Sequence, residues 1–334
     1  MDFVDCCLIL SRLSRTKGTF SLHSLFQNFV VSSISRIFAT KTYMSNDETN
    51  QMMNTYKTID LDDYIQTGEG GTARTYTHKT RPTMAKLFNP GNEAELAERE
   101  FLTARTVFEM GIPTPEPLQL VTDGERRGVE YELISNKRSF TRIISQEPER
   151  LEEISLAFAR MARELHTKKV NTLCFPSVKA RLRRFYLEKG DKVTEEYKER
   201  ALNFIDKTPD AETCLHGDLH IGNVITDGQR NLWIDLGQFS YGEPEWDLGW
   251  MWTICNRMDG KRTDFILHLT PETLKVHWSI FLTAYLGTDD KVTIADYTRR
   301  LMAYYAVRLP YMLDMQVQGR LPEEALQQLP KMIG

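Results

Sequence analysis

The segment CLHGDLHIGNVITDGQRNLWIDLGQFSYGEPEWDLGW, residues 214–250, places three candidate oxygen ligands at short spacing. Asp218 and Asn223 lie in its first part, and Asp235 follows the apolar run LWI. We expect a short loop and a small hairpin to bring the three together. Phosphoryl transfer requires a carboxylate that orients the attacking hydroxyl, and oxygen ligands for the Mg²⁺ that bridges the phosphates. The segment therefore predicts a phosphoryl-transfer site.

The run LWID predicts an apolar strand that ends in a carboxylate. A carboxylate at a buried strand end is costly unless it binds a metal or accepts several hydrogen bonds. This argument favours a metal ligand at Asp235. The alternative is that the acidic residues only cap turns and helices, and the joint occurrence of HGDLHIGN and IDLG in this order disfavours it.

A second motif, GEGGTA at residues 68–73, lies between two strand-like runs. Glycines allow the backbone to approach phosphate oxygens and to present N–H groups to them. The motif is not a Walker sequence, because no Gly-Lys-Ser/Thr follows, and it is not a Rossmann fingerprint, because a strand-like run follows it. A plain hairpin turn remains the alternative interpretation.

The motifs HGDLHIGNVI and WIDLG resemble the catalytic core of the aminoglycoside phosphotransferase and choline kinase-like family, which has the protein-kinase-like fold. The resemblance extends over roughly residues 56–310. It implies that Asp218 is the catalytic base, that Asn223 and Asp235 bind Mg²⁺, and that Asp247 braces the catalytic loop. The loop reads HGD rather than HRD, and no APE segment follows, which points to the small-molecule kinases of this fold.

The resemblance also implies an ATP site. Lys86, in the strand-like run TMAKLF, matches the lysine that holds the α- and β-phosphates. The adenine-binding connector falls at Glu132-Leu133-Ile134, so that Glu132 and Ile134 contact the base through backbone groups. The glycine motif reads GxGGTA rather than GxGxxG. Its residues in the phosphate-covering loop are Gly68, Gly70, Gly71 and Thr72.

Lys86 is expected to pair with a glutamate of the following helix. At about 100° per residue, Glu95 lies opposite the apolar stripe of that helix, and Glu98 and Glu100 flank the stripe on either side. Glu93 faces inward but lies in the first turn, where a favourable interaction with the helix dipole explains an acidic residue. Glu100 is the predicted partner of Lys86.

The pattern of elements predicts an α+β chain with a small β-rich lobe and a larger, mainly helical lobe. Short β-rich runs with turn residues begin near residue 55, and a helix ends near Gly111. Helical patterns dominate after residue 138, at roughly 148–166, 177–207, 244–258, 271–287 and 291–317. We predict three segments, namely a leader at 1–54, a nucleotide-binding lobe at 55–135 and a catalytic and substrate lobe at 136–334.

The leader carries a net charge of +3 over residues 1–44, and the whole chain of 334 residues carries −4. A transit peptide is one interpretation. An upstream extension, with initiation at Met44, Met52 or Met53, is favoured because Asp2 and Asp5 interrupt the leader pattern.

Composition excludes several classes of protein. A net charge of −4 and a pI near 6.0 give no general attraction to nucleic acid. The sequence contains no apolar run of 18 or more residues, so it does not predict a membrane-spanning helix. Five cysteines without a CxxC pair argue against a disulfide framework and favour the reducing cytoplasm.

The predicted acceptor is a hydroxyl of a small molecule. In one interpretation, the aromatic residues after Asp235 form a cage for a cation such as choline. The alternative is core packing, which is favoured because Trp246 and Trp250 lie one helical turn apart. The balanced charge of residues 251–334 does not support the acidic cleft that an aminoglycoside requires. An atypical protein kinase and a non-catalytic nucleotide-binding regulator remain as alternatives, and the joint presence of the four motif residues, Lys86 among them, argues against the regulator.

Overall fold

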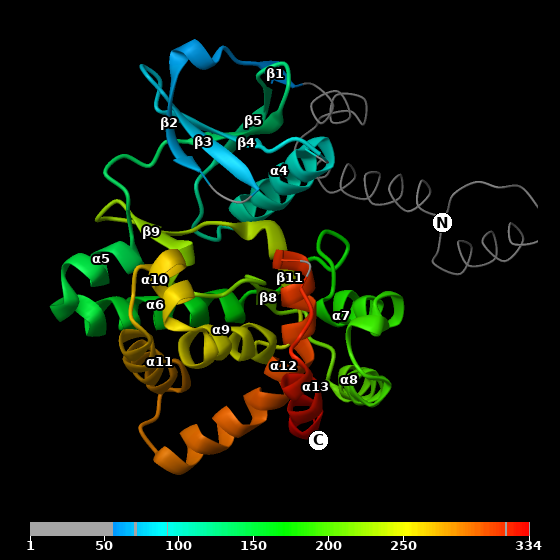
Figure 1. Cartoon of the computed structure of the whole chain (residues 1–334). Coiled ribbons are helices and arrows are strands. Elements are labelled where there is room, and N and C mark those ends of the chain that lie inside the picture. Colours follow the sequence, from blue (N-terminus) through cyan, green and yellow to red (C-terminus); the bar gives the residue numbers. More distant parts are fainter. Residues whose placement is uncertain (1–55, 70–71, 92, 318, 334) are drawn as a thin grey trace, which may run out of the picture. The chain divides into compact units, whose positions relative to one another are not determined.

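The amino-terminal part of the computed structural model is a six-stranded sheet covered by one helix (Figure 1). The structure describes residues 56–69, 72–91, 93–317 and 319–333. The strand order is β1-β5-β6-β4-β3-β2, and all neighbours are antiparallel except β1 and β5. The strands are β1 (Lys57–Thr58), β2 (Tyr64–Glu69), β3 (Ala73–His78), β4 (Thr83–Phe88), β5 (Pro117–Thr122) and β6 (Arg127–Glu132).

Helix α4 (Glu93–Glu109) packs on this sheet through its small apolar side chains. Ala97 and Ala104 are buried against Phe88 and Val129. The helix ends before Gly111, whose φ of 68° lies in the left-handed region that favours glycine. This packing directs one flank of α4 toward the centre of β4.

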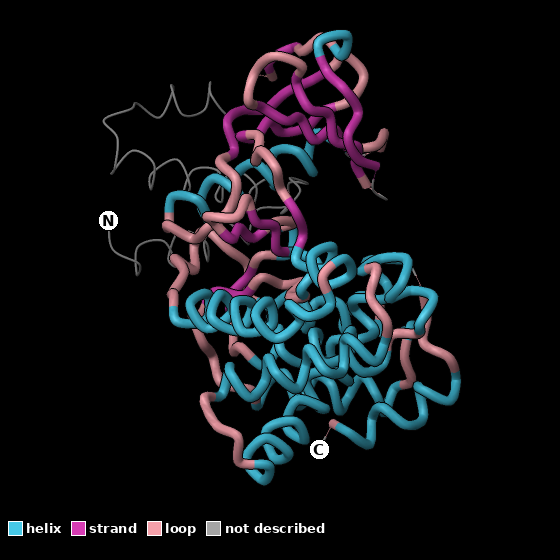
Figure 2. The backbone as a smooth tube through the Cα atoms, turned by 90° about the vertical axis from the view of Figure 1, so that its left-hand side faces the viewer, coloured by secondary structure: helices cyan, strands magenta, loops and turns pink. Residues whose placement is uncertain are grey.

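The carboxyl-terminal part is mainly helical. Figure 2 shows most of the strands gathered at one end of the molecule and most of the helices at the other. Its largest core joins α6, α9 and α11 and buries Phe158, Trp233 and Phe281. The helices are α5 (Phe140–Gln146), α6 (Leu151–Thr167), α7 (Val178–Glu188), α8 (Glu195–Lys207), α9 (Glu245–Arg257), α10 (Gly260–Leu267), α11 (Pro271–Leu286), α12 (Lys291–Val317) and α13 (Glu323–Gln328).

Two small sheets position the two motif segments of the sequence. Strands β8 (Cys214–Leu215) and β11 (Ser240–Tyr241) pair, and β9 (Val224–Thr226) pairs with β10 (Asn231–Trp233) and with β7 (Arg138–Ser139). The loop after β8 carries HGDLHIGN, and the loop after β10 carries IDLG. Strand pairing therefore brings the two loops side by side.

Helix α12 contains Pro310, which cannot donate to the carbonyl of Ala306 one turn earlier. The buried hydroxyl of Tyr197 in α8 donates to that carbonyl at 2.6 Å, and the hydroxyl of Tyr186 in α7 donates to the carbonyl of Val307 at 2.7 Å. These bonds tie α12 to α7 and α8 at the point where its own ladder is interrupted.

The predicted fold class is confirmed, with a small sheet-rich part and a larger helical part. The helical region predicted at 177–207 is divided into α7 and α8 by a 3-10 turn at Gly190–Lys192. Helices α5, α10 and α13 are short and were not predicted. The leader at 1–54 lies outside the described residues, and none of the described helices is long and apolar enough to cross a membrane.

Candidate active site

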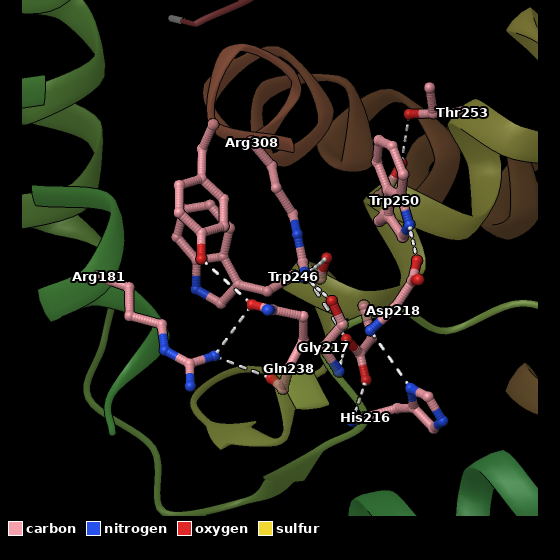
Figure 3. A network of polar contacts seen from close by, with 12 residues as sticks. Arg181, His216, Gly217, Asp218, Gln238, Trp246, Trp250, Thr253 and Arg308 are labelled. Atoms are coloured by element: carbon pink, nitrogen blue, oxygen red, sulfur yellow. Dashed lines mark hydrogen bonds and ion pairs between the residues drawn. The ribbon is translucent and has the colours of Figure 1, made fainter. Parts of the chain in front are cut away.

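The loop that carries His216, Gly217 and Asp218, drawn in Figure 3, is fixed by a buried carboxylate from α9. Asp247 is fully buried and accepts hydrogen bonds from the backbone N–H groups of His216 at 2.7 Å and Gly217 at 3.0 Å. Gly217 has a φ of 81°, and a Cβ there would lie 1.9 Å from the carbonyl oxygen of Gln238. The sharp turn before Asp218 therefore requires glycine and an acceptor beneath it.

Two cationic or polar groups support Asp247 from distant helices. Arg308 of α12 lies 3.5 Å from its Oδ1 and donates to the backbone carbonyls of Trp246 and Gly217. His166 at the end of α6 contacts its Oδ2 at 3.4 Å. Burial opposes ionisation of Asp247, but the hydrogen bond from His166 and the charge of Arg308 hold its pKa below the usual range.

Asp218 faces the cleft with one oxygen already held. The indole N–H of Trp250 donates to its Oδ1 at 2.6 Å, and its Oδ2 lies 3.9 Å from Nε2 of His220. Only 19% of the side chain is exposed. The partly buried carboxylate is thus oriented by a rigid donor rather than by an ion pair at hydrogen-bonding distance.

His216, next to this loop, is fully buried, and burial lowers its pKa. Its Nε2 donates to the carbonyl of Ile234 at 3.0 Å, and its Nδ1 accepts from the N–H of Asp218 at 3.3 Å. A neutral imidazole satisfies both contacts. His216 therefore joins the Asp218 loop to the segment that leads into Asp235.

In the six-stranded sheet, Lys86 of β4 forms an ion pair with Glu100 of α4 at 2.8 Å. The hydroxyl of Tyr131 donates to the other oxygen of Glu100 at 2.8 Å. Nζ of Lys86 also lies 4.0 Å from Oδ1 of Asp235. Burial acts against the charged ammonium, but Glu100 and Asp235 outweigh it and raise the pKa of Lys86.

Asp235 does not lie at a buried strand end, so the argument from burial cost is wrong for this residue. Strand β10 ends at Trp233, and 60% of the Asp235 side chain is exposed. Its backbone adopts the left-handed conformation, with φ 60° and ψ 54°. This uncommon conformation for a non-glycine residue turns the chain into the 3-10 helix Leu236–Gln238.

A cleft of about 340 Å³ brings several of the predicted site residues together. Thr72, Lys86, Glu100, Asp218 and Asp235 all line it. Gly68 lies in β2 opposite Thr75, below the tip of the β2–β3 hairpin. Gly70 and Gly71 lie outside the described residues.

The predicted connector residues do not line this cleft. The N–H of Glu132 donates to the carbonyl of Glu116 at 2.9 Å, and the N–H of Leu133 donates to that of Pro82 at 2.9 Å. The side chain of Ile134 is buried with Ile225 and Leu232. Two backbone donors of the connector are therefore engaged within the protein.

Asn223 is buried in the loop and does not line the cleft. Its Nδ2 donates to the carbonyl of Asp218 at 2.8 Å, and its own carbonyl accepts from Ile234 at 3.0 Å. With Nδ2 engaged, Oδ1 is the amide atom suited to a hard cation, and Asp235 adds an exposed carboxylate. Among the described residues, no three His, Cys, Asp or Glu side chains form a metal-binding group. This donor set suits Mg²⁺, which takes one or two protein oxygens together with phosphates and water.

Sequence reasoning missed two residues of this site. Trp250 was assigned to core packing, and it is buried, but its indole N–H also orients Asp218. Arg308 lies in a long helix without a local motif, more than 90 positions from the loop that it braces. Only the fold shows either role.

The model of the phosphotransferase enzyme family matches residues 63–267, whereas a search of curated proteins found no match. Similar solved structures include a choline/ethanolamine kinase family protein from Mesorhizobium loti, 15% identical with a TM-score of 0.50 over 87% of this chain and 95% of that chain. The aminoglycoside phosphotransferase APH(2″)-IIa, in its streptomycin–ATP ternary complex, is 17% identical with a TM-score of 0.51 over 86% and 96%. A Plasmodium vivax ethanolamine kinase is 16% identical with a TM-score of 0.51 over 82% and 81%. At these identities the similarities establish the kinase-like fold. Because the family match spans more than half of the sequence and includes both catalytic-loop motifs, the chain belongs to the phosphotransferase enzyme family.

Proposed function

We propose that the protein transfers the γ-phosphoryl group of ATP to a hydroxyl of a small molecule in the presence of Mg²⁺. The observation that carries this proposal is the shared cleft, in which the Lys86–Glu100 ion pair faces Asp235 with Asp218 beside it. Phosphoryl transfer depends mainly on positioning and on neutralisation of charge, and these four side chains are suited to both.

Lys86 is proposed to bind the phosphates of ATP. Its raised pKa keeps the ammonium charged at neutral pH, and Glu100 fixes its position. Thr72, on the same cleft, lies at the end of the glycine motif. ATP is named in the ternary complex of APH(2″)-IIa, which supports a nucleotide in the corresponding role here.

Asp235 and Asn223 are the proposed ligands of Mg²⁺. When bound, the ion neutralises charge on the phosphates during transfer. Asp235 is exposed to the cleft and is held 4.0 Å from Lys86, so its carboxylate is available to a cation. Asn223 stays fixed to Asp218 through its Nδ2.

Asp218 is proposed to orient the acceptor hydroxyl and to take its proton. The hydroxyl oxygen forms a bond to the γ-phosphorus, the bond from that phosphorus to the ADP oxygen breaks, and the proton passes to the carboxylate. Trp250 holds Oδ1 at 2.6 Å, which leaves Oδ2 for the hydroxyl. A small molecule is favoured as acceptor by the HGD loop and by the substrates named for structures of similar fold.

The direct test is ATP consumption over amino alcohols, amino sugars, aminoglycosides, sugars and peptides, each with and without Mg²⁺. We expect Mg²⁺-dependent formation of ADP and of a phosphorylated small molecule. A phosphorylated peptide as the best product would favour the atypical protein kinase. The absence of any ATP binding in calorimetry would contradict the proposed function.

A further inference from the structure

A second cavity, of about 290 Å³, adjoins the cleft and has a different chemical character. It is formed by α7, by the C-terminal part of α12, by Arg99 of α4 and by residues 237–238. Arg99, Gly237, Gln238 and Met315 line both cavities, so the two are adjacent. We call this second cavity the basic pocket.

The basic pocket carries more positive than negative charge. Arg99, Arg181, Arg184 and Lys189 line it, against the two carboxylates of Glu188 and Asp314. Asp314 is already neutralised, because Lys189 contacts it at 2.5 Å and Lys192 at 2.7 Å. Three arginines and one glutamate therefore remain to face the pocket.

None of the guanidinium groups of Arg99, Arg181 and Arg184 forms a salt bridge with a carboxylate in the part of the chain that the structure describes. Burial lowers the pKa of Arg181 to about 10, and the nearby charges of Arg99, Arg308 and Arg184 act in the same direction. Clustered cations that repel one another provide a favourable site for an anion.

Arg181 connects this pocket with the catalytic loop, and Figure 3 shows it reaching from α7 to Gln238. It donates to the backbone carbonyl of Gln238 at 2.9 Å. That same carbonyl packs against Gly217, directly before Asp218. A molecule whose hydroxyl lies at Asp218 can thus extend past Gln238 toward Arg99 and Arg184.

We propose that the basic pocket binds an anionic group of the acceptor, so that the substrate is an alcohol that carries a phosphate or a carboxylate. The inference rests on the proposed function, since it assigns the acceptor class to the same site. Guanidinium groups bind both anions through paired hydrogen bonds. A cationic amino alcohol would be repelled by the same arginines. In this the pocket differs from an aromatic cage or an acidic cleft, both of which bind cations.

The test compares acceptors that differ in charge at similar size. Glycerol 3-phosphate and glycerate form the anionic arms, glycerol the neutral arm, and ethanolamine and choline the cationic arm. ATP turnover is measured for wild type, Arg99→Gln, Arg184→Gln and Arg183→Gln. Arg183 is the matched control, because it lies beside Arg184 on α7 but pairs with Asp206 at 2.7 Å outside the pocket.

We expect the anionic arms to give the highest kcat/KM, and the better of the two anions identifies the group that the pocket prefers. Arg99→Gln and Arg184→Gln should each raise the acceptor KM by roughly tenfold. Arg184→Gln, whose residue lines only the basic pocket, should leave the KM for ATP unchanged, and Arg183→Gln should behave as wild type. A larger effect on ATP than on the acceptor would overturn the inference and assign the arginines to the nucleotide phosphates.

A binding measurement makes the outcome decisive even when turnover is slow. Glycerol 3-phosphate is titrated into wild type saturated with Mg²⁺ and a non-hydrolysable ATP analogue. Saturable binding that weakens in Arg184→Gln but not in Arg183→Gln supports the basic pocket. Preferred turnover of the cationic arm, or no anion binding to the nucleotide-loaded protein, overturns it. Failure to bind the ATP analogue would instead reject the proposed function itself.

Discussion

Asp218 and Asp235 lie in one cleft but in different environments. Asp218 is 19% exposed and is held by an indole N–H, whereas Asp235 is 60% exposed and has Lys86 at 4.0 Å. A carboxylate held in one orientation suits the positioning of a hydroxyl, and an accessible one suits a metal that arrives with the nucleotide. The two proposed roles follow from this difference.

Asp235→Asn should lower Mg²⁺-dependent turnover by at least ~10²-fold, because it removes the charged member of the proposed ligand pair. The side chain is exposed, so the melting temperature should change little. Turnover as a function of Mg²⁺ concentration, together with thermal unfolding, checks both expectations. Normal turnover with an unaltered Mg²⁺ dependence would remove Asp235 from the metal site.

Glu100→Gln should raise the KM for ATP by roughly tenfold, because Lys86 loses its fixed partner. It should also change the pH profile. Glu100 helps to raise the pKa of Lys86 above its ordinary value, and activity that needs the ammonium is lost as pH rises through that pKa. The alkaline limb of kcat/KM should therefore move to lower pH in the variant.

The control for this prediction is Glu98→Gln. Glu98 lies on the same helix but accepts a hydrogen bond from Tyr56 rather than from Lys86. It should leave the KM for ATP and the alkaline limb as in wild type. Equal shifts in both variants would indicate a general effect of the helix charge.

The partner of Lys86 could be predicted as Glu100 because the positions of side chains around a helix depend only on local geometry. The structure pairs Glu100 with Lys86. The second role of Trp250 was not predictable in the same way, since an indole near an apolar stripe looks like core from sequence. Whether its N–H reaches a carboxylate depends on how α9 crosses the loop after β8.

The site loops are held by helices remote in sequence. Asp247 of α9 binds the backbone before Asp218, and Arg308 of α12 binds both segments. The motif spacing predicts that Asp218 and Asp235 meet, because one loop and one hairpin separate them. The brace from α12 depends on a long-range packing that no local pattern encodes.

Tyr197→Phe should destabilise the protein by about 1–3 kcal/mol, because the carbonyl of Ala306 loses its buried donor. Pro310 cannot replace that donor. The free energy of unfolding from urea titration measures the cost. In a Pro310→Ala background, the N–H restored at residue 310 should reduce the cost of Tyr197→Phe. Equal costs in both backgrounds would contradict the role of Tyr197 as the replacement donor.

The charge of the basic pocket is not predictable from the composition of the chain. The net charge is −4, and residues 251–334 are nearly balanced, yet three arginines from α4 and α7 converge on one cavity. Counting charges along segments averages over this arrangement. The sequence therefore predicted the fold class and the catalytic motifs but not the charge of the adjoining pocket.

The folded protein should lose stability at acidic pH because of His277 of α11. Burial lowers the pKa of this histidine to about 3. Its Nδ1 contacts Ser155 at 2.8 Å, and its buried Nε2 has no partner among the described residues. The unfolded chain binds the proton below pH ~6.5 and the folded chain does not, so stability is lost as pH falls from about 6.5 toward 3.

Between pH 7.5 and 5 this one group should cost about 2 kcal/mol of unfolding free energy. Glutamine does not titrate in this range. The His277→Gln variant should therefore lose about 2 kcal/mol less unfolding free energy than wild type between the two pH values. Urea unfolding at the two pH values gives the difference directly. The same pH dependence in wild type and variant would show that His277 is not the group responsible.

In the proposed function, Asp218 carries the chemistry in a site that binds the nucleotide independently of it. The most direct measurement is kcat for Asp218→Asn with the best acceptor, alongside nucleotide affinity by calorimetry. We predict a loss of ~10²–10⁴-fold in kcat with Mg²⁺–ATP affinity unchanged. Retained kcat would reduce Asp218 to a structural residue of the loop, and a joint loss of rate and nucleotide binding would place it in the metal site instead.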